Sequence, residues 1–223
     1  MDRHLFLFGG GPPFTPVMGK CFAEIALRTD KPVSILNVER DGWKDYIHKY
    51  TQLLEVLGLR EFHLLPLPST PFDQVRNCLQ NSSGVIICGG NTNLYADYIV
   101  DSPISSLIVK QYESGYPVVG FSAGALISPD NCIISEKDNE QKEFQERVGL
   151  GLLSNVVIAV HFTQWNDEMH LRKAALKYEK HENFGIDENT CAYFNNGKLR
   201  RIEGEGVYSV KKDILRKIEI NSL

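Results

Sequence analysis

Residues 117–125 read PVVGFSAGA, and this stretch joins an apolar run to a glycine-rich turn. Val118 and Val119 belong to a continuous apolar run, which is typical of a parallel strand buried on both faces. The pattern G-x-S-x-G follows at once, with Ser122 at its centre. A strand that leads into this pattern favours a nucleophile elbow, a strained turn that projects the serine hydroxyl from the sheet edge. The stretch therefore predicts an α/β fold with Ser122 as a candidate nucleophile.

Short apolar runs alternate with segments of helical periodicity on both sides of this stretch. Alternation of this kind indicates a mainly parallel sheet with helices on both faces. Ligand sites in such sheets lie beyond the carboxyl ends of the strands, where Ser122 is expected. Strands are predicted at 5–8, 33–36, 62–65, 84–88 and 117–121, and helices at 46–57, 71–79, around 94–99 and at 104–113.

The second half of the chain has a different pattern. A further buried strand is predicted at 156–160, with its carboxyl end at the same sheet edge as Ser122, and a helix at 167–180. Asn195-Asn196-Gly197 between two short β-rich runs is a strong hairpin signal. The sequence therefore predicts an antiparallel C-terminal extension, with strands at 184–186, 191–194, 198–202 and 206–210. No linker or internal repeat interrupts the chain, so we expect a single domain over residues 1–223.

Composition excludes several classes of protein. The 223 residues are 43% hydrophobic and 23% charged, which is ordinary for a globular chain and argues against disorder. Lys and Arg number 24 against 28 Asp and Glu, so the net charge is −4. Such a chain lacks the basic excess of a non-specific nucleic-acid or anionic-membrane binder. We therefore expect neither nucleic acid nor membrane among its partners.

Cofactor and metal signatures are weak. The five cysteines form no C-x-x-C pair, which argues against a disulfide framework or a four-thiolate zinc site and favours free thiols. The cluster at 9–13 reads GGGPP, which is neither a dinucleotide fingerprint nor a phosphate-binding Walker loop, and we expect no cofactor. The apolar run Leu5–Phe8 is too short for a signal peptide, and no run reaches the length of a membrane span. These features predict a cytoplasmic protein.

A serine hydroxyl needs a general base to become a nucleophile, and His161 is the best candidate among the six histidines. It follows the predicted strand at 156–160, whereas His4 precedes its strand and belongs on the opposite edge. The other four fall within predicted helices or open a strand: His48, His63, His170 and His181. His161 is therefore expected to meet Ser122.

The third member of a triad is a carboxylate that fixes the tautomer of the imidazole. Between Ser122 and His161 the chain offers several Asp and Glu residues, most of which must be solvated surface charges. We take Asp138 as the predicted acid, with Glu136 as the main alternative.

Two backbone amides are candidates for an oxyanion hole. The amide of Ala123 directly follows the serine, which is the position used in nucleophile elbows. A second donor is expected from Gly89-Gly90-Asn91-Thr92, because glycines let the backbone approach a ligand closely. Asn91 is a candidate substrate-binding residue, and a role as helix cap is compatible with this.

Four stretches resemble the peptidase E and cyanophycinase family of serine peptidases: 89–92 (GGNT), 120–125 (GFSAGA), 160–162 (VHF) and 184–190 (FGIDENT) with its following hairpin. Their order and spacing agree over nearly the whole chain. The resemblance implies a flavodoxin-like sandwich similar to class I glutamine amidotransferases. It also implies Ser122 as nucleophile, His161 as general base, an oxyanion hole at Gly90 and Ala123, and short peptides as substrates.

Two departures from this family bear on the acid and on the substrate. Peptidase E carries an aspartate shortly after the elbow, and the corresponding segment here is 134–138, within which the register is open by about two residues. The family also places arginines soon after the histidine, a feature suited to acidic substrates. Here residues 163–167 read TQWND, and Arg172 is the first arginine. Arg172 could bind a substrate carboxylate or be a solvated helix charge.

Three other functions are weighed against a serine peptidase. An α/β-hydrolase esterase also uses G-x-S-x-G, but its histidine usually lies far beyond the serine and near the C-terminus. A glutamine amidotransferase would carry cysteine where Ser122 stands. The non-enzymatic hypothesis is a degenerate relative that binds peptides or metabolites. A monomer and a homodimer are both compatible with the sequence.

Overall fold

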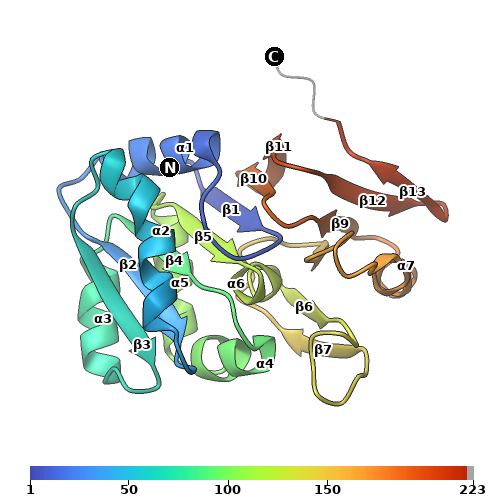
Figure 1. Ribbon diagram of the computed structural model, residues 1–223, viewed down its shortest axis with the longest axis horizontal. Coiled ribbons are helices and arrows are strands. Elements are labelled where there is room, and N and C mark those ends of the chain that lie inside the picture. The colour runs from blue at the N-terminus through green and yellow to red at the C-terminus, as the bar shows by residue number, and fades with distance from the viewer. Residues whose placement is uncertain (220–223) are drawn as a thin grey trace.

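Seven strands form the main sheet of the computed structural model, which describes residues 1–219 (Figure 1). Five neighbouring strands are parallel, and a hairpin pairs antiparallel with the first of them. The mainly parallel sheet predicted from the sequence is confirmed. In spatial order the strands are β11 (Lys198–Glu203), β10 (Cys191–Asn195), β1 (His4–Phe8), β5 (Val118–Phe121), β4 (Gly84–Ile87), β2 (Val33–Val38) and β3 (Phe62–Leu67).

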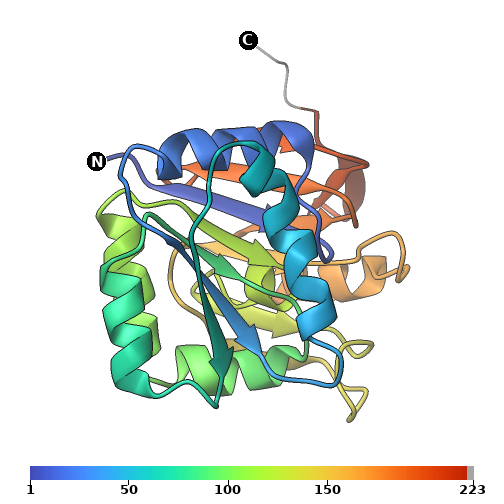
Figure 2. The ribbon, with the colours of Figure 1, turned by 60° about the vertical axis from the view of Figure 1, so that its left-hand side comes forward.

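Helices cover this sheet (Figure 2). Every residue of β1 and β2 is buried, so side chains on both faces of these strands are covered, as their continuous apolar sequences require. Within residues 1–219, no helix is long and apolar enough to cross a membrane. The helices are α1 (Pro16–Ala26), α2 (Lys44–Val56), α3 (Phe72–Gln80), α4 (Thr92–Tyr95), the π-helix η1 (Ala96–Val100), α5 (Ile104–Glu113), α6 (Ala123–Leu126) and α7 (Glu168–Lys177).

A second sheet contains the strand that the sequence had placed beside Ser122. Its order is β13 (Ile214–Lys217), β12 (Val207–Lys211), β9 (Glu182–Ile186) and β8 (Val156–Ala159). Strand β8 pairs parallel with β9 and does not join the main sheet, so the expectation that it ends at the same sheet edge as Ser122 is corrected. Strands β6 (Asn131–Ile134) and β7 (Gln145–Val148) form a separate pair. The predicted C-terminal extension is confirmed and is divided between the two large sheets.

The turn after β1 connects the two large sheets through its backbone. The Gly9 amide donates to the carbonyl of Thr190 at 3.1 Å, and the Gly9 carbonyl accepts from the amide of His161 at 2.7 Å. A Cβ at position 9 would lie 2.2 Å from the carbonyl oxygen of Ile186. Only glycine allows this approach between two stretches of backbone. Gly9, the first residue of the glycine cluster, is therefore required by packing at this turn.

We expect Gly9→Ala to lower the free energy of unfolding by about 2–3 kcal/mol, because the added methyl meets backbone rather than a movable side chain. Gly11→Ala is the matched control, since a Cβ at Gly11 would have no atom within 4 Å. The control should stay within about 0.5 kcal/mol of the parent protein. Urea unfolding of the two variants measures the difference, and equal midpoints would contradict the packing argument.

Candidate active site

Ser122 stands at a strained turn between β5 and α6. Its backbone has φ 48° and ψ −107°, a conformation that costs a non-glycine residue about 1–3 kcal/mol. Its amide donates to the carbonyl of Phe8 at 3.0 Å, which ties the turn to the end of β1. A Cβ on Gly120 would lie 2.4 Å from the Gly124 carbonyl oxygen, and a Cβ on Gly124 would lie 2.4 Å from the Ile87 carbonyl oxygen. Both glycines of the G-x-S-x-G pattern are therefore required by packing.

Aromatic rings fix the residue before the serine. Phe121 stacks on Phe8 with ring centroids 4.3 Å apart. Phe14 and Tyr50 meet the Phe121 ring edge-on, with centroids at 5.1 and 5.0 Å. Such a close-packed aromatic cluster holds the end of β5 rigidly and helps to maintain the strained turn that follows.

A chain of two short hydrogen bonds links Ser122, His161 and Glu188. Ser122 Oγ lies 2.8 Å from His161 Nε2, and His161 Nδ1 lies 2.6 Å from Glu188 Oε1. An ionised carboxylate can only accept a hydrogen bond. Nδ1 of His161 therefore carries the proton and donates the hydrogen bond to Glu188. Nε2 is then the acceptor for the serine hydroxyl. This is the tautomer that a general base needs.

The second sheet supplies both partners of the serine. His161 follows β8 and has φ 48°, while its amide donates to Gly9. Glu188 lies between β9 and β10, and its amide donates to Oε1 of Gln164 at 3.0 Å. The His161 side chain is 13% exposed and that of Glu188 is 41% exposed, so the hydrogen-bonded pair lies at the protein surface with its imidazole covered.

The two carboxylates that the sequence offered as the triad acid are placed elsewhere, which corrects that assignment. Asp138 Oδ2 accepts from the hydroxyl of Thr92 at 2.6 Å. Burial raises the pKa of Asp138, and the Thr92 hydrogen bond opposes this shift. Glu136 pairs with Lys173 at 3.2 Å on the surface. The acid that bonds His161 follows it by 27 residues instead of preceding it.

Glu188 has a signal in the sequence, although it lies outside the interval between Ser122 and His161. It closely follows the predicted strand at 184–186, within one of the four stretches that carry the family resemblance. A carboxylate at the carboxyl end of a strand is a candidate by the same rule that selected His161. What the pattern did not provide was the pairing of β9 with β8, which brings Glu188 beside the histidine.

The turn after β4 lies against the elbow, as expected for a second oxyanion donor. A Cβ on Gly89 would lie 3.3 Å from Cβ of Ser122. The hydroxyl of Tyr50 accepts from the Gly89 amide, and that of Tyr95 donates to the Gly89 carbonyl, both at 3.2 Å. Among the hydrogen bonds found in residues 1–219, none uses the amides of Gly90 and Ala123. Both remain predicted oxyanion donors.

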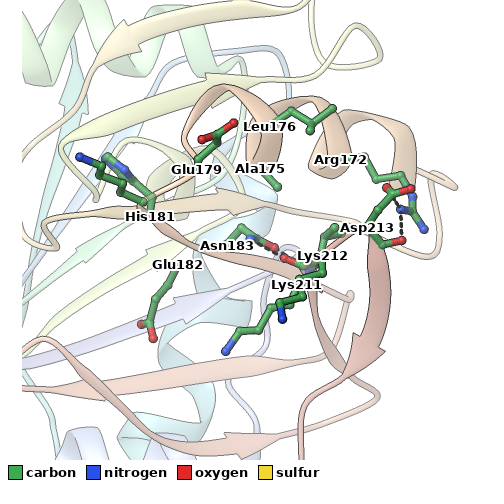
Figure 3. Close-up of a pocket in the computed structure, with 12 residues that line it drawn as sticks. Arg172, Ala175, Leu176, Glu179, His181, Glu182, Asn183, Lys211, Lys212 and Asp213 are labelled. Carbon is green, nitrogen blue, oxygen red and sulfur yellow. Dashed lines mark hydrogen bonds and ion pairs between the residues drawn. The ribbon is translucent and has the colours of Figure 1, made fainter.

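The two predicted substrate-binding side chains have structural partners. Asn91 caps α4 by accepting from the Leu94 amide at 3.1 Å. Arg172 lies on α7, where its guanidinium donates to Glu168 and to Asp213. Figure 3 shows the Arg172–Asp213 pair at the border of a cavity of about 500 Å³ between α7 and the β12–β13 hairpin. Arg172 is therefore held by two carboxylates, and the structure does not bring it to Ser122.

The cysteines are free, as the sequence predicted. Cys88 ends the apolar run at 84–88 and lies close to Gly89, but burial raises the pKa of its thiol to about 12. At neutral pH Cys88 is protonated and does not compete with Ser122 as a nucleophile. Within the described part of the chain, no three His, Cys, Asp or Glu side chains are grouped as metal ligands.

Comparison with known families agrees with this geometry. Residues 38–202 match the model of peptidase family S51. This chain belongs to that family of serine peptidases. It is 26% identical to the cyanophycinase of Trichormus variabilis and 25% identical to that of a Nostoc species, each over 169 residues. The match covers 73% of this chain but only 57% of either cyanophycinase, so the chain spans little more than half of their length.

Solved structures share the fold of this S51 chain. A peptidase from an acI-B1 actinobacterium superposes with a TM-score of 0.73 at 18% identity, covering 100% of this chain and 96% of that one. A putative peptidase E from Listeria monocytogenes has a TM-score of 0.65 at 16% identity and covers 98% of this chain and 100% of its own. At these identities the likeness supports the architecture alone.

We expect Glu188→Gln to lower kcat far more than Asp138→Asn. An amide in place of the Glu188 carboxylate favours the wrong imidazole tautomer, which costs up to about 10⁴ in kcat in a measured serine triad. Asp138→Asn keeps an oxygen that can accept from Thr92 and leaves the His161–Glu188 bond in place. Steady-state peptide hydrolysis by the two purified variants tests this. The opposite ranking would return the acid to Asp138.

The half-buried Asp138 carboxylate also makes a prediction for stability. Its pKa in the folded protein is raised above the ordinary 3.8, so folding loses free energy as the pH rises through these values. Asn cannot ionise, so Asp138→Asn should be more stable than the parent at pH 7. This gain should vanish below about pH 3.8, where Asp138 is protonated in both states.

Urea unfolding at pH 7 and at pH 3.5 measures the effect, with the exposed Glu136→Gln as control. The control should not change stability at either pH by more than about 0.5 kcal/mol. A loss of stability in Asp138→Asn that is equal at both values would rule out the burial effect.

Proposed function

We propose that this chain is a serine peptidase that hydrolyses short peptides through Ser122, His161 and Glu188. The proposal is carried by the continuous hydrogen-bond chain from the serine hydroxyl through the imidazole to the Glu188 carboxylate. A strained elbow, a base in the correct tautomer and an orienting carboxylate are the parts that acyl transfer requires. Membership of family S51 supports the same reaction.

In the proposed mechanism Ser122 Oγ attacks the peptide carbonyl while His161 Nε2 takes its proton. Glu188 stabilises the imidazolium through the proton on Nδ1. The amides of Ala123 and Gly90 donate to the developing oxyanion. The imidazolium then protonates the leaving amine, and a water activated by His161 hydrolyses the acyl-enzyme.

The expectation of short substrates is supported by the segment between β6 and β7, which closes one side of the site. Asp138 ties this segment to Thr92 at the start of α4. The neighbouring Lys137 ties it to the turn after His161, where it donates to the carbonyls of Trp165 and Asn166. An extended polypeptide would have to cross this bridged wall, whereas a dipeptide or tripeptide ends before it.

A preference for acidic side chains stays a prediction without an assigned receptor. Arg172 is held by its own carboxylate partners, as described above. Arg147 is bound in the same way by Asp97 and Asp101, at 2.6 and 2.5 Å. Cations that are already neutralised by internal carboxylates have little to gain from a substrate carboxylate. Neither Arg172 nor Arg147 is therefore assigned to bind an acidic substrate side chain.

The esterase alternative is not favoured by the order of the triad. In α/β-hydrolases the chain order is serine, acid, histidine. Here the order is Ser122, His161, Glu188, and the acid lies on the second sheet. Covalent labelling of Ser122 separates the non-catalytic alternative from the proposal, because a protein that only binds peptides does not need an activated serine.

The test combines a serine-reactive fluorophosphonate with a panel of dipeptides, short peptides and denatured casein. The parent protein should be labelled at Ser122 and should cleave short peptides but not casein. Ser122→Ala should fold normally, resist labelling and lose about 10⁶ in kcat, as in measured serine triads. Efficient casein digestion would contradict the short-peptide proposal. Absence of labelling in the folded parent, or activity in the purified variant, would overturn the serine mechanism.

A further inference from the structure

An indole ring covers the imidazole of His161. The ring centroids of His161 and Trp165 are 4.2 Å apart, and the two planes make an angle of only 17°. Trp165 is partly buried, and the triad described above makes no use of it. Stacking at this distance places the π face of the indole directly on the ring that gains a proton during catalysis.

Several backbone contacts hold the indole in place. The Trp165 amide donates to the His161 carbonyl at 2.8 Å and closes the turn between the two rings. Lys137 donates to the carbonyls of Trp165 and Asn166. Lys137 also pairs with the buried Asp167 carboxylate at 3.8 Å. These contacts fix the backbone from which the indole extends toward the His161 ring.

We propose that Trp165 is a positioning residue that fixes the plane of the His161 imidazole and stabilises its protonated form. This inference rests on the proposed function, because it concerns the proton that His161 takes from Ser122. Stacking keeps Nε2 aimed at the serine without blocking either ring nitrogen. The negative face of the indole favours the imidazolium over the neutral ring.

Other charged groups also act on His161. Glu188 bonds its Nδ1, and the half-buried Asp138 lies close enough for its charge and that of His161 to interact. Lys137 pairs with the buried Asp167 and donates to the turn after His161. Substitutions at Trp165 leave all four charged side chains in place. A change in the rate at which His161 activates Ser122 can therefore be assigned to loss of the indole.

The first measurement is the rate of fluorophosphonate labelling in Trp165→Leu and Trp165→Phe. Leucine retains apolar bulk but has no π face, whereas phenylalanine keeps an aromatic face of smaller area. We expect labelling of the leucine variant to slow about tenfold and that of the phenylalanine variant to stay within about threefold of the parent. Equal rates in all three proteins, or an equal loss in both variants, would overturn the proposal.

The second measurement is a spectroscopic one that needs no catalysis. The sequence contains two tryptophans, and Trp43 lies beside His48 in a cavity at the start of α2, so it is replaced by Trp43→Phe. A protonated imidazole in van der Waals contact quenches indole emission. Emission from Trp165 should therefore fall on acidification, and the step should disappear in a further His161→Gln variant.

The two measurements separate the two proposals. If the folded parent is not labelled, the serine mechanism fails, but the emission step still tests the contact between Trp165 and His161. If labelling occurs and the step is absent or survives His161→Gln, the stacking role of Trp165 is overturned while the serine peptidase stands. Trp43→Phe alone should label at the parental rate, since Trp43 belongs to neither the triad nor its supports.

Discussion

The close approach of backbone to backbone at Gly9 is the constraint on which the site depends. The main sheet carries the proposed nucleophile, and the proposed base and acid follow strands β8 and β9 of the second sheet, so the proposed reaction needs the two sheets to meet at a fixed distance. The Gly9 carbonyl accepts from His161, its amide donates toward the segment that carries Glu188, and the preceding Phe8 carbonyl accepts from Ser122. A single methyl group at position 9 would overlap the backbone of the second sheet.

Both residues that are proposed to exchange a proton belong to the nine non-glycine residues with positive φ among residues 1–219. Ser122 and His161 both have φ 48°, in a region that non-glycine residues rarely adopt. Each is held there by an amide hydrogen bond to the end of β1, and the rings around Phe121 fill the space beneath the serine. Rigid packing of this kind places the hydroxyl and the imidazole within hydrogen-bond distance before any substrate arrives. The reaction then does not bear the entropic cost of orienting these two groups.

Two carboxylates near the site have different roles: Glu188 bonds the imidazole, and Asp138 supports the surrounding structure. Glu188 bonds the imidazole near the surface, where its side chain is 41% exposed. Asp138 is more deeply buried, has a raised pKa and holds Thr92, so it supports the wall of the site from within. The turn that follows His161 contacts both members of the hydrogen-bonded pair. Gln164 accepts from the Glu188 amide, and Trp165 stacks on the imidazole.

The sequence alone determined the parallel sheet and the candidates for the nucleophile and the base. Continuous apolar runs and a G-x-S-x-G turn are local patterns, and the rule for carboxyl ends of strands located Ser122 and His161. Only the tertiary structure decided which carboxylate bonds His161 and which carboxylates bind Arg172. Glu188 reaches His161 because β9 pairs with β8, and Arg172 is neutralised by a carboxylate 41 positions away, at Asp213. Contacts between segments so far apart in sequence leave no periodic signal in the chain, because they arise from strand pairing and helix packing within the second sheet.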